Sequence, residues 1–474
     1  MKLSHRRSTM LGLLGLLSVF LLGFVSNASA ISNGQAASLV IGQSSFITNN
    51  IATTSTELNL PYGLVFDSGG NLWVADLNNN RVLEYTSPFS THEAASLVIG
   101  QSSFTSSASA TTSTGLNNPQ GLAFDSGGNL WVVDQLNSRV LKYTTPFSTN
   151  EAASLVIGQS SFTTSDFATT NSTSLSYPTG LAFDSSGNLW VADQANNRVL
   201  EYTMPFSTHE AASLVIGQSS FTTSNFPITA KGLNGANAVA FDTKGNLWVS
   251  DFRHDRVMEY TTPFSTHEAA SLVIGQSSFT ACDSCFTGSG PATSSTVLFN
   301  PTNLKFDSGG NLWVVDGSFN RVLEYNAPFI TDEAASIVIG QSDFTSNTAA
   351  TTSRGLSGPY GLAFDSSGYL WVADTANSRV LQYGSSSAAT TSTSTGTSTS
   401  SPTTSASTTT SSTPSTFTSS TPSSTTSSST ASRTTGGGGG IPEFPFQPLT
   451  AAVLTALIVT SYLLIRRNVS RRLI

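Results

Sequence analysis

One segment of this chain recurs six times, and that repetition constrains the fold more than any other feature. An arginine marks the same place in each copy: Arg81, Arg139, Arg198, Arg256, Arg321 and Arg379. These arginines are 58, 59, 58, 65 and 58 residues apart, and all six tryptophans share a second equivalent position. A period of this length indicates a modular fold in which each copy forms one structural unit.

Each copy contains four short segments with strand character. In the third copy they are SLVIGQ, GLAFD, NLWVAD and RVLEY, which are rich in β-branched, aromatic and aliphatic residues and bounded by turn residues. A glycine in DSSGN or DSGGN stands between the second and third segments, where a tight hairpin needs a positive φ. No repeat sustains the periodicity of a helix. We therefore predict an all-β fold, a six-bladed propeller of four-stranded antiparallel blades.

The phase of the repeat predicts a closed ring. SLVIGQ at residues 38–43 precedes the first GLVFD segment, whereas no such segment follows the last RVLQY at residues 379–383. Pairing the amino-terminal strand with the last blade would complete that blade and remove two exposed edges. The alternative is an open solenoid, which would need distinct polar caps at both ends.

The motif D-x-x-N-x-R-V after a GNLWVAD strand resembles the NHL-repeat family of β-propellers, over residues 36–383. The resemblance implies that the Asp and the Arg of the motif are structural and tie together the loop after the second strand. A charge half-buried between blades persists only when it is paired. The expected pairs are Asp76 with Arg81, Asp134 with Arg139, Asp193 with Arg198, Asp251 with Arg256, Asp316 with Arg321, and Asp374 with Arg379.

Residues 1–30 have the features of a secretory signal peptide. A basic start with Lys2, Arg6 and Arg7 leads into an apolar stretch, which ends at the small-residue sequence Ala28-Ser29-Ala30. An uncleaved signal anchor is the alternative. The propeller would then occupy residues 31–383.

Residues 384–440 are dominated by Ser and Thr and end in five glycines. Such a composition cannot bury enough apolar surface to fold, so we expect a disordered, O-glycosylated stalk.

Residues 441–474 combine the motif IPEFPF, an apolar run over 449–465 and four arginines at the end. The run is close to the shortest length that spans a membrane, and the arginines predict a cytoplasmic carboxyl terminus with the propeller outside. This order resembles the PEF-type sorting signals of archaeal surface proteins, which implies cleavage by an archaeosortase-like enzyme and attachment to lipid. A plain single-pass transmembrane helix predicts the same localisation at the cell surface, anchored to the cytoplasmic membrane.

The charge of the repeat region argues against a nucleic-acid partner. Residues 31–383 contain 27 Asp and Glu against 12 Lys and Arg, a net charge near −15. An acidic ring repels a phosphate backbone. It suits cations, sugars or basic partners instead.

The residue before each GLAFD-type strand is expected at the mouth of the central channel, where propellers bind ligands. These residues are Tyr62, Gln120, Thr179, Asn237, Thr302 and Tyr360. A metal centre needs several converging oxygen or nitrogen ligands. Hydroxyls, amides and two aromatic rings suit contacts to carbohydrate or peptide better than bond cleavage. The alternative is that they only solvate the funnel.

The fourth and fifth copies depart from the repeat. We expect their unusual residues on the funnel side as a specialised ligand-binding sector, or else as simple drift of the repeat: Phe252, Arg253, His254 and Phe319. The fifth copy also has a seven-residue insertion that holds the only cysteines, Cys282 and Cys285. In an oxidising compartment they predict a local disulfide. Free or redox-active thiols and a metal site are the alternatives, although a closed zinc site needs four ligands.

Together these features favour a cell-surface-anchored extracellular binding, adhesion or scaffold propeller for a surface carbohydrate or protein. No catalytic residue, metal ligand or cofactor is assigned, and no nucleophile elbow, P-loop or dinucleotide fingerprint is present. The alternative is an exported metal-dependent lyase or hydrolase of the propeller type.

Overall fold

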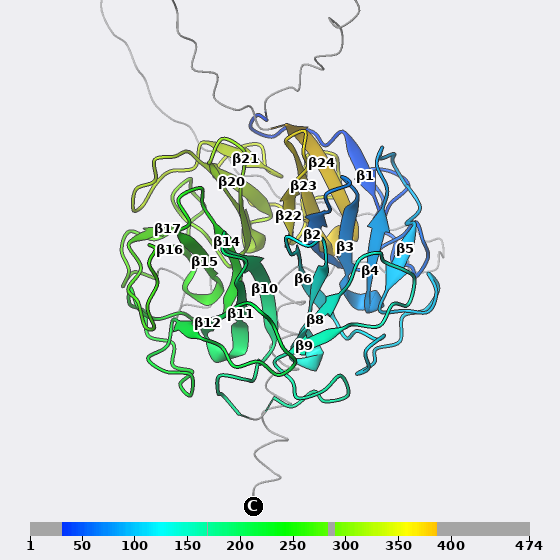
Figure 1. Cartoon of the computed structure of the whole chain (residues 1–474). Helices are drawn as coiled ribbons and strands as arrows, with labels where there is room; N and C mark the ends of the chain where they lie inside the picture. Colours follow the sequence, from blue (N-terminus) through cyan, green and yellow to red (C-terminus); the bar gives the residue numbers. More distant parts are fainter. Residues whose placement is uncertain (1–30, 168, 283–289, 386–474) are drawn as a thin grey trace, which may run out of the picture. The chain divides into compact units, whose positions relative to one another are not determined.

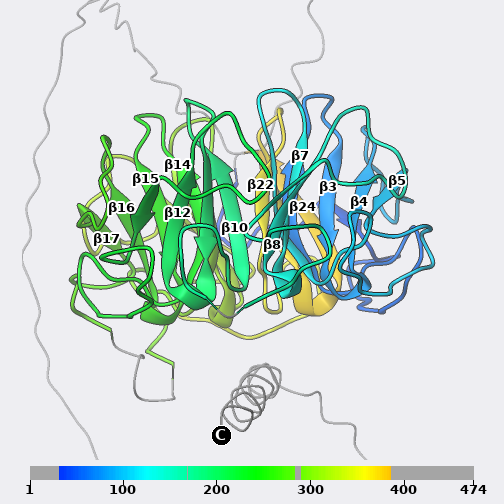
Figure 2. The same cartoon turned by 60° about the horizontal axis from the view of Figure 1, so that its bottom comes forward.

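The computed structural model describes residues 31–167, 169–282 and 290–385 of the chain. These residues form six four-stranded antiparallel sheets, which surround a central axis as the blades of a propeller (Figure 1). Figure 2 shows the strands of each blade following one another outward from the axis. The predicted all-β fold with six blades is confirmed.

The first three blades have nearly the same strand lengths. The first consists of β2 (Pro61–Phe66), β3 (Leu72–Asp76), β4 (Arg81–Tyr85) and β5 (Leu97–Ile99). The second consists of β6 (Pro119–Phe124), β7 (Leu130–Asp134), β8 (Arg139–Tyr143) and β9 (Leu155–Ile157). The third consists of β10 (Pro178–Phe183), β11 (Leu189–Asp193), β12 (Arg198–Tyr202) and β13 (Leu214–Ile216).

The other three blades keep this plan, and the sixth takes one strand from the amino-terminal end. The fourth consists of β14 (Ala236–Phe241), β15 (Leu247–Asp251), β16 (Arg256–Tyr260) and β17 (Leu272–Ile274). The fifth consists of β18 (Pro301–Phe306), β19 (Leu312–Asp316), β20 (Arg321–Tyr325) and β21 (Ile337–Ile339). The sixth consists of β22 (Leu362–Phe364), β23 (Tyr369–Asp374), β24 (Arg379–Ser385) and β1 (Leu39–Ile41).

A short 3-10 turn follows the second strand of every blade. These turns are η1 (Leu77–Asn79), η2 (Gln135–Asn137), η3 (Gln194–Asn196), η4 (Phe252–His254), η5 (Gly317–Phe319) and η6 (Thr375–Asn377). The hairpin between the first two strands of each blade contains a glycine with φ between +76° and +83°. A side chain would be strained in this left-handed conformation, so the predicted requirement for glycine is confirmed.

The ring closes through the amino-terminal strand, as predicted. Strand β1 pairs antiparallel with β24, and Val40 lies opposite Leu381 in the register. The amide of Ser38 also donates a 2.8 Å hydrogen bond to the carbonyl of Gln382. The outer edge of the last blade is therefore covered by a segment from the other end of the repeat region.

The hydrophobic core is divided into six clusters, each between two neighbouring blades. Trp131 of the second blade is fully buried against the third, where its ring meets Phe183 and Phe206 edge-on at centroid distances of 5.7 and 5.0 Å. Its indole N–H donates to Asp125 Oδ2 at 3.0 Å. Both faces of each sheet are covered by neighbours, which explains why the central strands are apolar on both faces.

Each blade contains one buried Asp–Arg pair at the end of its second strand. In the third blade, Nε of Arg198 lies 2.7 Å from Oδ2 of Asp193, and neither side chain is exposed to solvent. The same guanidinium donates to the carbonyl oxygens of Asn171 and Ser174, at 2.9 and 3.0 Å. Five further pairs have the same geometry. The pair therefore links the loop before each blade to the blade itself.

Among the residues that the structure describes, no helix has the length and apolar character needed to cross a membrane. The predicted signal peptide, sorting motif and membrane span lie outside the described residues, as does the predicted stalk from residue 386 onward. Residues 384 and 385, predicted as the start of the stalk, belong to β24.

The first prediction concerns the buried pair. Arg198→Met should lower the free energy of unfolding by about 3–5 kcal/mol, because Asp193 is left as an uncompensated buried charge. Adding Asp193→Leu should recover much of the loss. Denaturant unfolding midpoints measure both effects. Lys244→Met, at an exposed position, is the control and should change little.

The second prediction concerns ring closure. Deletion of residues 31–45 should lower the melting temperature markedly and increase binding of an apolar dye, because it exposes the edge of β24 and one face of the last blade. Ile47→Ala, which alters a side chain that is 76% exposed, should leave both readings unchanged. A truncated protein that melts like the intact one would show that closure does not stabilise the ring.

Candidate functional site in the central channel

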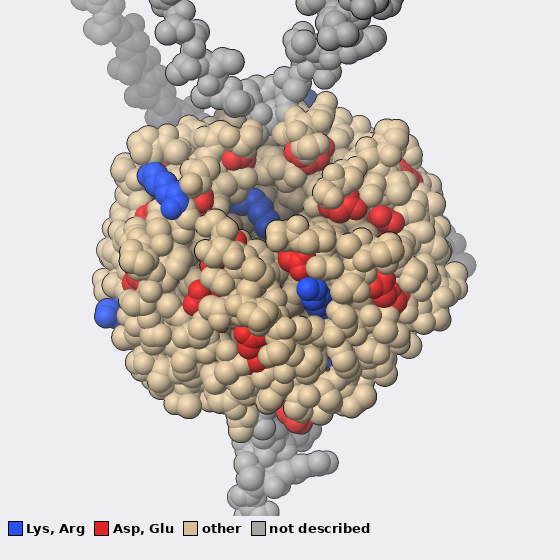
Figure 3. Space-filling model, viewed as in Figure 1, with Lys and Arg blue, Asp and Glu red and all other residues tan. Residues whose placement is uncertain are grey.

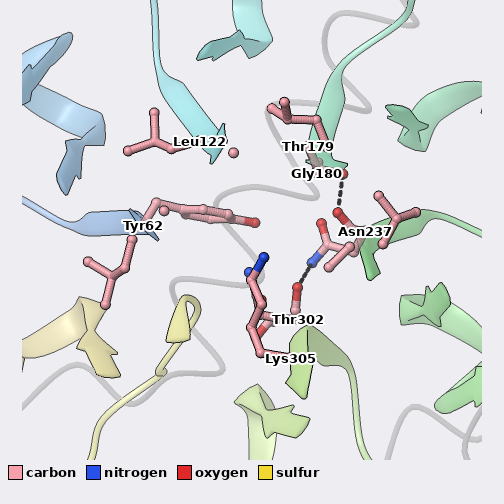
Figure 4. Close-up of a pocket in the computed structure, with 14 residues that line it drawn as sticks. Tyr62, Leu122, Thr179, Gly180, Asn237, Thr302 and Lys305 are labelled. Atoms are coloured by element: carbon pink, nitrogen blue, oxygen red, sulfur yellow. Dashed lines mark hydrogen bonds between the residues drawn. The ribbon is translucent and has the colours of Figure 1, made fainter. Parts of the chain in front are cut away.

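The inner strands of the blades surround a cavity on the propeller axis. Its empty volume is about 410 Å³, counting the part open to solvent. Residues of β2, β6, β10, β14 and β18 form its wall (Figure 4). Figure 3 shows the hollow on one face of the ring, where charged side chains are scattered over a mostly uncharged surface.

Glycines allow the inner strands to approach one another closely. A Cβ atom at Gly180 would lie 2.6 Å from the carbonyl oxygen of Asn237, and one at Gly361 would overlap the carbonyl oxygen of Tyr62. The equivalent positions in the fourth and fifth blades hold Ala238 and Asn303. Backbone contacts between neighbouring inner strands thus set the width of the channel, except at the fourth and fifth blades.

The structure brings the residues predicted at the channel mouth together. Tyr62, Thr179, Asn237 and Thr302 line the cavity. The ring of Tyr360 packs on the ring of Tyr62, with centroids 4.4 Å apart and an angle of 31° between the planes.

Gln120, the sixth residue of the predicted ring, is buried, with only 4% of its surface exposed. Its Oε1 atom has no hydrogen-bond partner among the described residues. Gln120 is not among the residues that line the cavity, so this acceptor lies inside the second blade.

Hydrogen bonds between blades fix the other polar side chains of the ring. Thr179 Oγ1 donates to the carbonyl of Asn237 at 2.7 Å, and Asn237 Nδ2 donates to the carbonyl of Thr302 at 3.0 Å (Figure 4). Thr302 Oγ1 donates to the carbonyl of Tyr360 at 3.1 Å. Burial raises the pKa of the Tyr62 and Tyr360 hydroxyls, so both remain neutral at physiological pH. The polar groups of the ring are therefore fixed and neutral, and those of Thr179, Asn237 and Thr302 are largely buried.

Lys305 also lines the cavity, and the sequence analysis missed it. Its side chain extends from β18 toward the axis (Figure 4). Lys305 lies opposite Trp313 in the register, a position held in the other blades by Val65, Ala123, Ala182, Ala240 and Ala363. Burial lowers the pKa of its ammonium. Aligning the six copies on their tryptophans would have revealed this single basic departure.

Two residues predicted to face a ligand do not do so. His254 is buried, and its Nδ1 lies 2.9 Å from Asp251 Oδ2. Asn196 makes the same contact to its own aspartate in the third blade, through Nδ2 at 2.9 Å. The last residue of the 3-10 turn points back toward the buried carboxylate, so His254 replaces a structural asparagine and belongs to the loop interior.

Phe319 occupies the same turn position in the fifth blade and is only 3% exposed. Its ring lies 5.4 Å from the ring of Phe299 and 5.0 Å from the guanidinium carbon of Arg321. Phe319 is not among the residues that line the cavity, because apolar packing around the buried ion pair holds the ring inside.

Phe252 and Arg253 lie on η4, half-buried and exposed respectively, but not among the residues that line the cavity. Cys282 Sγ lies 3.7 Å from the carbonyl oxygen of His254, which places the start of the insertion beside this turn. Cys285 lies outside the described residues, so the disulfide stays a prediction. The described residues contain no group of three or more His, Cys, Asp or Glu side chains able to hold a metal ion.

Asp255, which follows η4, is an unusual buried acid in the same sector. Its Oδ1 accepts a 2.8 Å hydrogen bond from the amide of Asn300. In the third blade the equivalent Asn197 accepts the same bond and also donates, through Nδ2, to the carbonyl of Ser224 at 2.9 Å. An ionised aspartate has no such donor. Burial, helped by the nearby charges of Asp316 and Asp251, raises the pKa of Asp255 to about 7.

The third prediction follows from this raised pKa. A folded-state pKa above the unfolded value gives stability that is present below about pH 4 and is lost as the pH rises through about 7. Asp255→Asn should therefore stabilise the protein at pH 7.5 and have little effect at pH 4. Melting temperatures across this range measure the difference. Asp332→Asn, at an exposed position, is the control; equal pH profiles for both variants would contradict the assignment.

Three segments match the protein-family model described as NHL repeat: residues 58–85, 116–143 and 175–202. Each covers the three inner strands of one of the first three blades. These three segments of the chain are similar to NHL repeats. Together with the six-bladed architecture, these matches support a β-propeller of the NHL type.

Several solved structures match the chain at low sequence identity. A catalytically inactive virginiamycin B lyase from Staphylococcus aureus, solved with quinupristin, is 14% identical; the match covers 69% of this chain and 82% of that chain, with a TM-score of 0.40. A Bacteroides thetaiotaomicron protein of unknown function is 15% identical over 74% and 76%, with a TM-score of 0.47. A putative gluconolactonase is 12% identical over 69% and 89%, with a TM-score of 0.43. No curated protein matches the chain.

Proposed function

We propose that this protein is a cell-surface binding or adhesion propeller that engages an extracellular carbohydrate or protein at its central channel without catalysing a reaction. The observation that carries the proposal is the chemistry of the channel mouth. Tyr62, Thr179, Asn237 and Thr302 present hydroxyl, amide and aromatic groups around one cavity. A concave site with apolar surface and a few fixed polar groups is typical of ligand binding.

The fixed geometry of these groups supports recognition. Asn237 is held by two neighbours, because its amide donates to Thr302 while its Oδ1 accepts from Gln194 Nε2 at 3.2 Å. A polar group that is already oriented loses little entropy when a ligand binds.

The surface location is part of the same proposal. It rests on the signal sequence of residues 1–30, the Ser/Thr-rich segment after the propeller and the apolar run before the terminal arginines. An extended stalk of about fifty residues would hold the propeller on the order of 150 Å from the membrane. Residues 441–474 would provide the anchor, either as a membrane helix or after PEF-type cleavage and attachment to lipid.

The fourth prediction tests the site. A screen of surface glycans and cell-wall polymers against the full-length protein should yield a ligand whose affinity falls about fivefold in Asn237→Ala, since one oriented hydrogen bond is worth about 1 kcal/mol. Asn50→Ala, at an exposed position away from the cavity wall, is the matched control. A ligand that binds both variants equally would place the binding surface elsewhere.

Metal analysis of the purified protein distinguishes the binding role from the competing class, an exported metal-dependent lyase or hydrolase. Calcium or zinc held tightly at one ion per chain would favour that class and count against a purely binding role.

A further inference from the structure

We propose that the channel binds an acidic sugar, with the ammonium of Lys305 pairing the sugar carboxylate. The inference deepens the proposed function and rests on it for the location of the site. In this proposal one lysine recognises the carboxylate, which the neutral groups repeated around the ring cannot do.

The fifth blade alone makes the channel wall basic and more polar. Lys305 stands at a position held by Val or Ala in the other blades, and it is the basic residue among those that line the cavity. Two residues earlier, Asn303 stands where four other blades have glycine. Both side chains come from β18, so one side of the cavity differs from the rest.

Lys305 is a half-buried lysine in the wall of the cavity. None of the described residues makes a hydrogen bond or an ion pair with it, although burial already lowers its pKa. An amine that has lost part of its hydration gains more from an anion than an exposed amine does. A carboxylate beside Lys305 would favour the protonated form and offset the cost of burial.

The surrounding groups favour a sugar over a bare anion. Tyr62 extends into the cavity toward the end of Lys305 (Figure 4), so its ring gives the wall an aromatic surface. The ring of Tyr360 packs on it, with centroids 4.4 Å apart. Asn303 lines the cavity and adds an amide group suited to sugar hydroxyls. Phosphate groups are usually held by several convergent donors or by arginine. A single lysine fits one carboxylate better.

The negative net charge of the ring is consistent with a short-range contact between Lys305 and a ligand carboxylate. Residues 31–383 carry a net charge near −15, with 27 acidic and 12 basic residues. The protein as a whole does not attract anions, so selection for a carboxylate must come from short-range pairing inside the cavity. Long-range attraction of a polyanion would instead require a broad basic surface.

The fifth prediction compares D-glucuronate with D-glucose, which differ by a carboxylate in place of a hydroxymethyl group. Calorimetric titration of the full-length protein should show glucuronate binding at least about tenfold more tightly, as expected for one charge-assisted contact. Lys305→Ala, which introduces the residue of four other blades, should abolish the difference without lowering the melting temperature. Lys305→Met should do the same while keeping the side-chain volume.

Lys142→Ala removes a positive charge that lies 3.3 Å from Asp125, outside the channel wall. This control should leave the preference for glucuronate unchanged. The preference should also weaken as the pH rises through the lowered pKa of Lys305, because the contact needs the protonated amine.

Equal affinity for the two sugars, or a preference that survives Lys305→Ala, would overturn the proposal. Equal binding of N-acetylglutamate would overturn the sugar assignment in favour of an acidic peptide. Failure of both sugars to bind would also overturn it, while leaving the proposed function intact if the polymer screen finds a ligand that depends on Asn237. If neither sugar binds and the polymer screen also finds no ligand that depends on Asn237, the proposed binding function is itself wrong.

Discussion

The buried ion pair between the second and third strands of each blade is the contact on which the rest of the propeller depends. Asp193 Oδ2 pairs with Arg198, while its Oδ1 accepts a 2.6 Å hydrogen bond from the amide of Ser176. Ser176 lies three residues before Thr179, so the carboxylate fixes the point from which the inner strand enters the channel wall. The pair stabilises the blade and also positions the channel mouth, and its hydrogen bonds to the neighbouring loop strengthen both roles.

The fourth and fifth blades show what happens when one donor of this network changes. His254 replaces the asparagine that contacts the aspartate and keeps a 2.9 Å contact to Asp251. Phe319 offers no such donor, and burial raises the pKa of Asp316 to about 6. The fourth and fifth blades therefore differ from the others in the groups that surround the buried carboxylate. His254 and Phe319, at the last position of the 3-10 turn, alter the loop interior rather than a ligand surface.

Features that recur in all six copies could be predicted from the sequence, because each is required by a repeated physical constraint. The hairpin glycines, the closing strand at residues 38–43 and the strand pattern follow from turn geometry and edge pairing. The channel-mouth residues followed from their place before each inner strand. His254 and Phe319 were misplaced because the 3-10 turn, which points its last residue inward, has no clear sequence signal. Lys305 could not be recognised as easily, because the rest of its strand resembles the inner strands of the other blades and such strands are usually structural.

A propeller built from similar repeats has a limitation as a binding protein, because its axis presents the same groups in every direction. A ligand on the axis is held in one orientation only if one blade differs. The change from Ala240 or Ala363, each 5% exposed at the equivalent position, to Lys305 gives the channel such a difference. The side chain of Lys305 extends from β18 into the cavity (Figure 4). One side of the cavity therefore carries a charge that the alanine or valine of the other blades does not supply.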